Sequence, residues 1–208
     1  PPAPPAIAPP VPGLAAPQKP GPNPSAVLEL YPTQGCSSCP PADALLAKLT
    51  DAPGVVTLSY AVDYWNYLGW RDTLSSPANS ERQRDYARVR GDGKVYTPQM
   101  VVDGLIHVNG SNEAAIEMAM RKAGEQLAKA KVPIAMRAEA DTLVIDIGAA
   151  PEASDKRAAT VWLALAKDKE TVSITRGENR GQRITYHHPV RELSPVGMWK
   201  GEAMTIRL

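Results

Sequence analysis

The sequence contains no phenylalanine, and aromatic residues make up only 5% of its 208 residues. A buried core must therefore consist mainly of valine, leucine, isoleucine, alanine and methionine. Lysine and arginine (23 residues) almost balance aspartate and glutamate (22 residues), which leaves a net charge of +1. This balance excludes the broad positive field on which nonspecific nucleic-acid binding depends, so we predict no nucleic-acid partner.

Cysteine is also scarce. Two cysteines are too few for a small scaffold held together by several disulfides, and a chain of 208 residues is long enough for one large domain or two small ones. We predict no cofactor. The two cysteines stand close together, as Cys36 and Cys39, and this spacing is the most informative feature of the sequence.

Proline is concentrated at the beginning of the chain, where the first 24 residues hold 11 of the 21 prolines. Prolines at this density interrupt intrahelical hydrogen bonding, so residues 1–25 are predicted to be an extended arm or linker and not a transmembrane segment. The arm has no signal-peptide pattern, and the chain begins with Pro1, so we expect a processed protein that is periplasmic or otherwise exported. A removed or preceding N-terminal segment could tether it to a membrane. The arm is either a passive spacer or a docking segment for a membrane-associated partner.

The segment after the arm alternates between strand and helix patterns. Apolar runs at residues 27–31 and 55–62 predict two strands, and residues 40–49 between them predict a helix that begins with two prolines. Ser80 starts a capping-box pattern that predicts a second helix to about Arg90. A hairpin and a third helix follow. Strands that alternate with helices in this way predict an α/β domain.

Beyond residue 131 the pattern becomes rich in strands. Six alternating runs, separated by short polar turns, contain no helical segment. We therefore predict an α/β domain at residues 26–131 and an antiparallel β-rich, sandwich-like extension at residues 132–208. The six predicted strands are residues 132–140, 142–147, 159–166, 171–175, 184–190 and 203–208.

The spacing of Cys36 and Cys39, in a loop between a strand and a helix, favours thiol–disulfide chemistry. Two cysteines on the first turn of a helix can form a disulfide without strain. The unpaired N–H groups and the dipole at the helix start stabilise the thiolate of the first cysteine, so Cys36 is the predicted attacking thiol and Cys39 the resolving one. A zinc site is disfavoured because no second cysteine pair exists, and a structural disulfide would close too short a loop to add much stability.

The pair Thr97-Pro98 provides a second, independent indication. A proline that opens a strand after a βαβ unit can be cis, and in the thioredoxin superfamily such a cis-proline packs beside the cysteine pair. There the residue before the proline offers its backbone to an incoming peptide. Cys36, Cys39, Thr97 and Pro98 are therefore the predicted catalytic residues.

Five motifs carry a closer resemblance. They are Glu29-Leu30-Tyr31, Gln34-Gly35-Cys36-Ser37-Ser38-Cys39-Pro40-Pro41-Ala42-Asp43, Val62-Asp63-Tyr64-Trp65 with Leu68-Gly69-Trp70, Tyr96-Thr97-Pro98-Gln99-Met100-Val101-Val102-Asp103-Gly104, and Arg176-Gly177-Glu178-Asn179. Together they resemble the DUF1223 family of secreted, thioredoxin-like bacterial proteins, whose biochemical role is not established, from Leu28 to about Val190. The resemblance implies a thioredoxin-like core, a C-terminal β-rich extension and an exported setting, but no substrate. The chain departs from the family at Tyr31-Pro32, where members usually have Phe followed by a small hydroxyl residue.

Other polar and aromatic residues are weaker candidates. Asp63, at the end of the second predicted strand, is a candidate proton acceptor for Cys39, because thioredoxin-like proteins use a buried acid there. Asp43 is expected only to favour the N-terminal turn of its helix. The aromatic cluster between Tyr60 and Trp70 is predicted mainly to pack in the core, although it could also line a peptide or ligand site.

Basic and histidine residues give two further interpretations. Four arginines alternate with acidic residues, which predicts a solvated helix face; they are Arg82, Arg84, Arg88 and Arg90. His187 and His188 are adjacent on a predicted strand, so only one of them can face a shared site. If His187 or His188 reached Cys36 and Cys39, the three side chains would form a copper site, and His187 is the residue we name for it.

Three functions follow from these observations. The leading prediction is an extracytoplasmic protein that exchanges thiols and disulfides with protein partners through Cys36 and Cys39. The first alternative is a redox-inert accessory subunit of a membrane-associated assembly, docked through residues 1–25. The second is a copper-binding carrier that uses the cysteine pair and His187.

Overall fold

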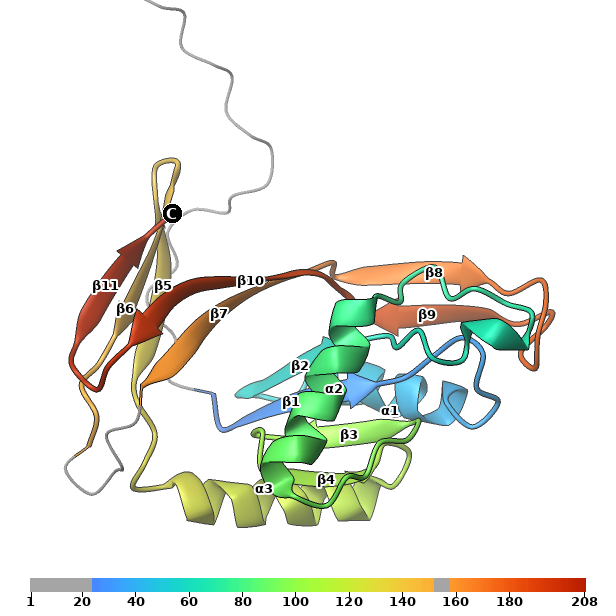
Figure 1. Cartoon of the computed structure of the whole chain (residues 1–208), viewed down its shortest axis with the longest axis horizontal. Coiled ribbons are helices and arrows are strands. Elements are labelled where there is room, and N and C mark those ends of the chain that lie inside the picture. Colours follow the sequence, from blue (N-terminus) through green and yellow to red (C-terminus); the bar gives the residue numbers. More distant parts are fainter. Residues whose placement is uncertain (1–23, 152–157) are drawn as a thin grey trace, which may run out of the picture.

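The computed structural model describes residues 24–151 and 158–208 (Figure 1). Apart from Pro24 and Ser25, the predicted arm and its docking role lie outside the described residues. The elements, in chain order, are β1 (Ala26–Tyr31), α1 (Pro40–Thr50), β2 (Val55–Ser59), the 3-10 helix η1 (Asn66–Leu68), α2 (Pro77–Arg90), β3 (Gln99–Val102), β4 (Ile106–Asn109), α3 (Glu113–Leu127), β5 (Ile134–Glu139), β6 (Thr142–Ile147), β7 (Ala159–Ala166), β8 (Lys169–Ser173), β9 (Arg183–His187), β10 (Val190–Trp199) and β11 (Met204–Arg207).

The first four strands form one mixed sheet in the order β2-β1-β3-β4. β1 and β2 are parallel, with α1 as the connection between them, whereas β3 is antiparallel to β1 and to β4. A parallel pair joined by a helix is the βαβ unit that the sequence predicted. The α/β organisation of the first part of the chain and the antiparallel β sheets of the last part are thus confirmed.

Alternation along β1 and β3 gives this sheet two different faces. Leu28 and Leu30 point to the face that α1 and α3 cover, and Tyr31 points to the opposite face, which α2 covers. The first face is aliphatic, as expected from a sequence without phenylalanine, and packs residues of β1, β3, α1 and α3 together: Leu28, Leu30, Ala42, Leu45, Leu46, Met100, Val102, Ile116, Ala119 and Ala123.

A buried ion pair holds α2 on the second face. Glu29 of β1 is 5% exposed and accepts two hydrogen bonds from the guanidinium of Arg82, at 2.8 and 2.7 Å. The hydroxyls of Tyr31 and Tyr86 donate to the same carboxylate, each at 2.8 Å. The sequence interpretation of Arg82 as part of a solvated face is therefore wrong, because the structure pairs it with a buried acid from a distant strand.

The start of α2 also differs from the prediction. The helix begins at Pro77, and Ser76 caps it by accepting a hydrogen bond from the Asn79 N–H at 3.2 Å. Proline suits the first helical position because its missing N–H has no partner there. Ser80, the predicted cap, is instead buried one turn into the helix.

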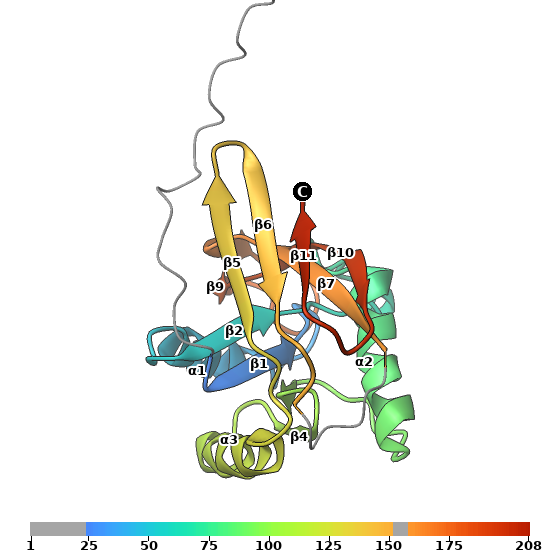
Figure 2. The same ribbon diagram turned by 90° about the vertical axis from the view of Figure 1, so that its left-hand side faces the viewer.

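The last part of the chain forms three antiparallel sheets. β5, β6 and β11 make a three-stranded sheet in the order β11-β6-β5, which projects away from the first sheet in Figure 2, and β7 pairs with β10. The sequence pattern missed most of β10, because Pro195 and Gly197 interrupt its apolar alternation. The structure accommodates both residues at an irregularity in the β7–β10 register.

The β8–β9 hairpin lies on the α/β part of the molecule, although it follows the predicted boundary at residue 131. The Ser59 N–H at the end of β2 donates to the carbonyl of His188 at 3.0 Å, and Ser59 forms a parallel bridge with Pro189. Tyr186 of β9 packs against Ala61 and Leu74 in a small separate core. Residues of the predicted extension therefore reach the end of the first sheet that carries the cysteines (Figure 1).

None of the helices within residues 24–151 and 158–208 is both long and apolar enough to span a membrane.

Candidate active site around Cys36 and Cys39

Both cysteines lie where the chain passes from β1 into α1. Cys39 is the N-cap residue of α1, and its carbonyl accepts hydrogen bonds from the N–H groups of Ala42 at 2.9 Å and Asp43 at 3.1 Å. The Cys39 N–H donates to the carbonyl of Cys36 at 3.1 Å, so the two residues share one tight turn. Both side chains are free thiols, with 4% of Cys36 and none of Cys39 exposed.

Cys36 has the environment of a stabilised thiolate. Its sulfur lies 3.1 Å from the Ser38 hydroxyl and 3.9 Å from the Thr97 carbonyl. The Cys39 thiol is the main cause that lowers the pKa of Cys36 to about 5, and the Ser38 hydroxyl acts in the same direction against the effect of burial. The same contact with Cys36, together with burial, raises the pKa of Cys39. The two thiols therefore differ strongly in acidity, as attacking and resolving thiols do.

The segment before β3 forms the wall opposite the cysteine turn. The peptide bond between Thr97 and Pro98 is cis, and the Pro98 carbonyl accepts a hydrogen bond from the Gly110 N–H at 3.0 Å. A Cβ atom at Gly110 would lie 2.6 Å from Leu30 Cδ1, 3.2 Å from Ala42 Cβ and 3.4 Å from Pro98 Cβ. Glycine at this position therefore lets β1, the start of α1 and the cis-proline loop approach each other closely.

The turn between β8 and β9 clamps the cysteine loop from the other side. The amide of Asn179, which is 1% exposed, donates to the carbonyls of Gln34 and Cys36, both at 2.9 Å. Glu178 accepts a hydrogen bond from the Ser37 N–H at 3.1 Å. The sequence interpretation used these two residues only as part of a family motif. That motif lies far along the chain from the cysteines. It was the only sequence signal for the contact of Glu178 and Asn179 with the cysteine loop.

Gln34 connects the cysteine loop to the segment before α2. Its N–H donates to Asp72 Oδ2 at 2.7 Å, and its side-chain oxygen accepts a hydrogen bond from the indole N–H of Trp70 at 2.8 Å. Asp72 also accepts hydrogen bonds from the N–H groups of Leu74 and Ser75, at 2.8 and 3.1 Å. This carboxylate is therefore a structural acceptor that holds two loops together.

Asp43 is the buried acid with the clearest link to the cysteines. It lies on α1 one turn after Cys39, is 3% exposed, and its Oδ2 has no hydrogen-bond partner among the described residues. Burial, followed by the negative charges of Asp72 and Cys36, raises its pKa well above the usual range. The charge of Asp43 in turn contributes to the raised pKa of Cys39. A spacing of four residues places Asp43 on the same helix face as Cys39, so the sequence itself carries a signal for this contact.

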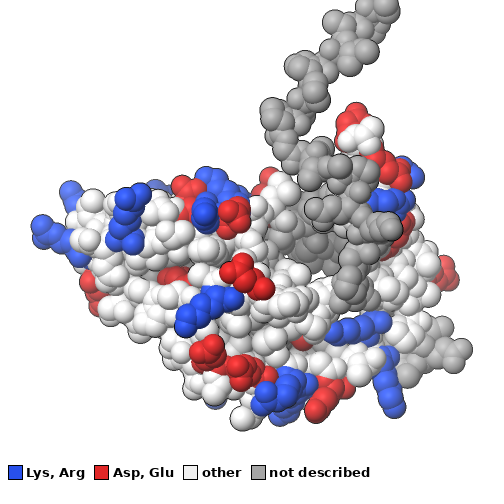
Figure 3. All heavy atoms as spheres, turned by 180° about the vertical axis from the view of Figure 1, so that it is seen from behind, with Lys and Arg blue, Asp and Glu red and all other residues white. Residues whose placement is uncertain are grey.

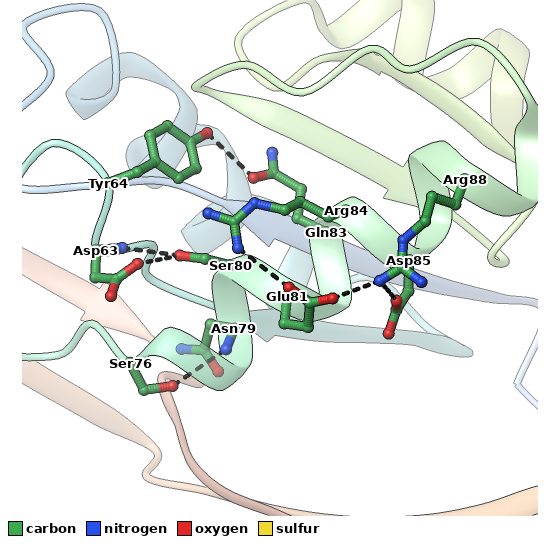
Figure 4. Close-up of polar contacts among 10 residues, drawn as sticks. All are labelled: Asp63, Tyr64, Ser76, Asn79, Ser80, Glu81, Gln83, Arg84, Asp85 and Arg88. Carbon is green, nitrogen blue, oxygen red and sulfur yellow. Dashed lines mark hydrogen bonds and ion pairs between the residues drawn. The ribbon is translucent and has the colours of Figure 1, made fainter.

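Asp63, the predicted proton acceptor for Cys39, forms hydrogen bonds with Ser80 instead. Figure 4 shows its carboxylate at the Ser80 hydroxyl, which donates to Oδ1, while the Ser80 oxygen accepts from the Asp63 N–H. The adjacent Tyr64 donates its hydroxyl hydrogen to Gln83 at 3.1 Å. Asp63 thus fixes the start of α2 to the end of the central strands, and Asp43 has the electrostatic contact with Cys39.

The structure does not bring His187 to the cysteines. Within residues 24–151 and 158–208, no three or more histidine, cysteine, aspartate or glutamate side chains are arranged to hold a metal ion. His188 faces β2, with its Nδ1 2.9 Å from the Thr57 hydroxyl. The copper alternative therefore has no ligand set in the described part of the chain.

The aromatic residues after β2 serve more than one purpose. Tyr60 is buried and stacks on Tyr31, with ring centroids 5.5 Å apart. Trp70 supports the cysteine loop through Gln34. Tyr67, in contrast, is 79% exposed. The cluster is therefore partly core and partly support for the cysteine loop.

Comparisons with known proteins show the family of the chain and a solved structure with a similar fold. A family model described as "Protein of unknown function (DUF1223)" matches residues 27–208. The chain is also similar to the crystal structure of protein AGR_C_4864 from Agrobacterium tumefaciens, at 38% sequence identity and a TM-score of 0.78. That match covers 90% of this chain and 79% of the other. No curated protein matches the chain.

Proposed function

The chain belongs to the DUF1223 family, as its sequence motifs predicted, and we propose that it is an exported, thioredoxin-like protein that exchanges thiols and disulfides with protein substrates. Cys36 is the attacking thiol and Cys39 the resolving thiol. The observation that carries the proposal is the position of the Cys36 sulfur, in a turn at the start of α1 and 3.9 Å from the carbonyl that precedes cis-Pro98.

In the reducing direction the reaction has two steps. The Cys36 thiolate attacks one sulfur of a substrate disulfide, which forms a mixed disulfide and releases the other substrate sulfur as a thiolate. The Cys39 thiol then loses its proton and attacks the Cys36 sulfur. This breaks the mixed disulfide, releases the second substrate thiolate and leaves a Cys36–Cys39 disulfide. Two electrons pass from the protein dithiol to the substrate, and the reverse sequence oxidises a substrate dithiol.

The second step requires a proton acceptor, because the pKa of Cys39 is raised. We assign this role to Asp43 in place of Asp63. Asp43 lies on the same helix as Cys39, its Oδ2 has no hydrogen-bond partner among the described residues, and it interacts electrostatically with both cysteines. A carboxyl with a raised pKa binds a proton more readily than an ordinary carboxyl, so it is suited to accept the Cys39 proton.

The proposal is tested by redox titration in glutathione buffers combined with an insulin-reduction assay. We expect reversible titration above about −300 mV, because structural disulfides lie below that potential. Cys36→Ser should abolish insulin reduction, and Cys39→Ser should accumulate a mixed disulfide with the substrate. A pair that stays oxidised in every buffer, or a Cys36→Ser variant with normal turnover, would overturn the proposal.

The exported setting is part of the same proposal and rests on the proline-rich head and the family resemblance. Fractionation of the native host cells tests it. We expect the protein outside the cytoplasm, and recovery with cytoplasmic markers would contradict the exported setting without affecting the exchange chemistry.

A further inference from the structure

Gln83 on α2 is a polar residue that the fold buries completely, with 0% of it exposed. Its amide nitrogen donates to the Tyr96 carbonyl at 2.9 Å and to the side-chain oxygen of Gln99 at 2.8 Å. Its amide oxygen accepts a hydrogen bond from the Tyr64 hydroxyl at 3.1 Å (Figure 4). This amide has one preferred orientation, because turning it over would place its oxygen against the Tyr96 carbonyl.

Two of these partners flank the residues that face Cys36. Tyr96 directly precedes Thr97, and Gln99 directly follows Pro98, so a single side chain of α2 holds the chain on both sides of this pair. Gln99 is also buried, and its own amide donates to the Lys94 carbonyl at 3.1 Å. The position of the loop that carries Thr97 therefore depends on a network of buried hydrogen bonds from α2.

The Thr97 carbonyl lies 3.9 Å from the Cys36 sulfur. The chain of a substrate that is bonded to this sulfur passes beside the carbonyl, which is an acceptor for a backbone N–H. Charge offers less selection, because the net charge is only +1 and Figure 3 shows acidic and basic side chains interspersed over the rear face of the molecule. Contacts close to the sulfur therefore decide which disulfide the site binds.

We propose that Gln83 is a positioning residue for substrate binding, which holds the Thr97 carbonyl where it accepts a hydrogen bond from the backbone N–H of a peptide disulfide. The site then prefers disulfides within a peptide chain over small disulfides that have no amide N–H. This rests on the proposed exchange function and adds substrate selection to it. Gln83 acts through the loop and forms or breaks no covalent bond, so the two exchange steps are unchanged.

The test compares a peptide disulfide with hydroxyethyl disulfide, which has no amide. Gln83→Met removes the amide and keeps the length of the side chain. Asn79→Leu is the matched control, because Asn79 is buried one turn earlier on α2 and its amide also donates to a backbone carbonyl, that of Ala61 at 2.9 Å (Figure 4). Single-turnover oxidation of the reduced full chain by each disulfide gives a limiting rate and a half-saturating concentration, after urea unfolding has shown that each variant is folded.

For Gln83→Met, we expect the half-saturating concentration of the peptide disulfide to rise about tenfold, which corresponds to the loss of one hydrogen bond. Its limiting rate, and the reaction with hydroxyethyl disulfide, should stay unchanged. Asn79→Leu should alter neither reaction. An equal loss with both disulfides, or an equal rise in the control variant, would overturn the positioning role and leave the exchange function intact. A wild-type protein that reacts with neither disulfide would instead overturn the exchange function.

Tyr64→Phe is a second, milder variant that keeps the ring and removes only the hydroxyl that fixes the Gln83 oxygen. We expect the half-saturating concentration of the peptide disulfide to rise about threefold, with hydroxyethyl disulfide again unaffected. If Gln83→Met does not fold, an unchanged value in Tyr64→Phe overturns the proposal.

Discussion

Two buried carboxylates on opposite sides of the first sheet have opposite environments. Glu29, on the α2 side, is 5% exposed and receives hydrogen bonds from the guanidinium of Arg82 and from two tyrosine hydroxyls. Asp43, on the α1 side, is 3% exposed, and one of its oxygens has no partner among the described residues. Both lie in the same domain, yet one is fully paired and the other is not.

The difference indicates two different uses of a buried acid. A paired carboxylate with several donors keeps its charge and fixes the position of α2, because a buried charge is tolerated when it is compensated. An uncompensated carboxyl costs stability whenever it ionises, so its presence beside two cysteines requires a reason other than folding.

Arg82→Met should lower the free energy of unfolding by about 3–5 kcal/mol, because it leaves the charge of Glu29 buried without its partner. Urea unfolding of the reduced protein measures this change. The matched control is Arg84→Met on the same helix, whose exposed pair with Glu81 contributes less than about 1 kcal/mol. An equal effect of the two substitutions would show that Glu29 is not a compensated structural acid. The double variant Glu29→Gln/Arg82→Met should recover part of the loss.

Asp43→Asn should slow the resolving step about a hundredfold at neutral pH, which is the usual contribution of a general acid or base. The side chain keeps its shape but no longer accepts the Cys39 proton. Stopped-flow measurement of substrate release from the mixed disulfide reports this step separately from the first attack. Asp51→Asn, at the exposed end of the same helix, is the control and should leave the rate unchanged. An unchanged rate in Asp43→Asn would show that Asp43 is not the proton acceptor for Cys39.

Asn179→Ala should lower the free energy of unfolding by about 1–3 kcal/mol, because the buried carbonyls of Gln34 and Cys36 lose their donor. The substitution acts on the cysteine loop, so the hydrogen bonds of Glu29 on the other side of the sheet should be unaffected. Urea unfolding measures the loss, and the alkylation rate of Cys36 should rise as the loop loosens. Thr175→Ala, exposed in the same turn, is the control. A loss no larger than that of Thr175→Ala would contradict the clamp.

The smallest effect is a pH dependence. The pKa of Asp43 is raised in the folded protein above its ordinary value of 3.8, so between these two values the folded state holds a proton that the unfolded state has released. Wild-type stability should therefore fall as pH rises from about 4 through the folded pKa. The advantage of Asp43→Asn over the wild type should grow across that window and then stay constant. Urea midpoints at successive pH values test this, and a difference that does not change with pH would contradict a buried, ionisable Asp43.

Local sequence patterns predicted most helices and strands of the α/β part. They failed for residues and strands whose positions depend on tertiary contacts. The apolar runs of β1 and β2 and the prolines of α1 are signals that short segments carry by themselves. The role of Arg82 depends on a partner 53 positions away along the chain, so its alternation with acidic residues suggested a solvated face instead. β10 was missed because its proline and glycine are tolerated only at an irregularity of the paired strands.

The candidate site shows the same division. Cys36 and Cys39 were predicted as site residues from their spacing, and Thr97 and Pro98 from the likeness to the thioredoxin superfamily; in the structure the Cys36 sulfur lies 3.9 Å from the Thr97 carbonyl. For the acid, the spacing indicates that Asp43 shares a helix face with Cys39, but the sequence does not show which group holds Asp63. Asp63 and Asp43 both lie near predicted strand or helix ends, and only the packing of the loop before α2 gives Asp63 to Ser80 and leaves Asp43 beside the cysteines.

By itself, the sequence determined the cysteine pair, its place between a strand and a helix, the family and the aliphatic character of the core. These depend on residue type and spacing over a few positions. The tertiary structure alone decided that the turn between β8 and β9 holds the cysteine loop and that Arg82 pairs with the buried Glu29. Each of these joins segments that are tens of residues apart, and such distances are set by the packing of whole elements rather than by local preference.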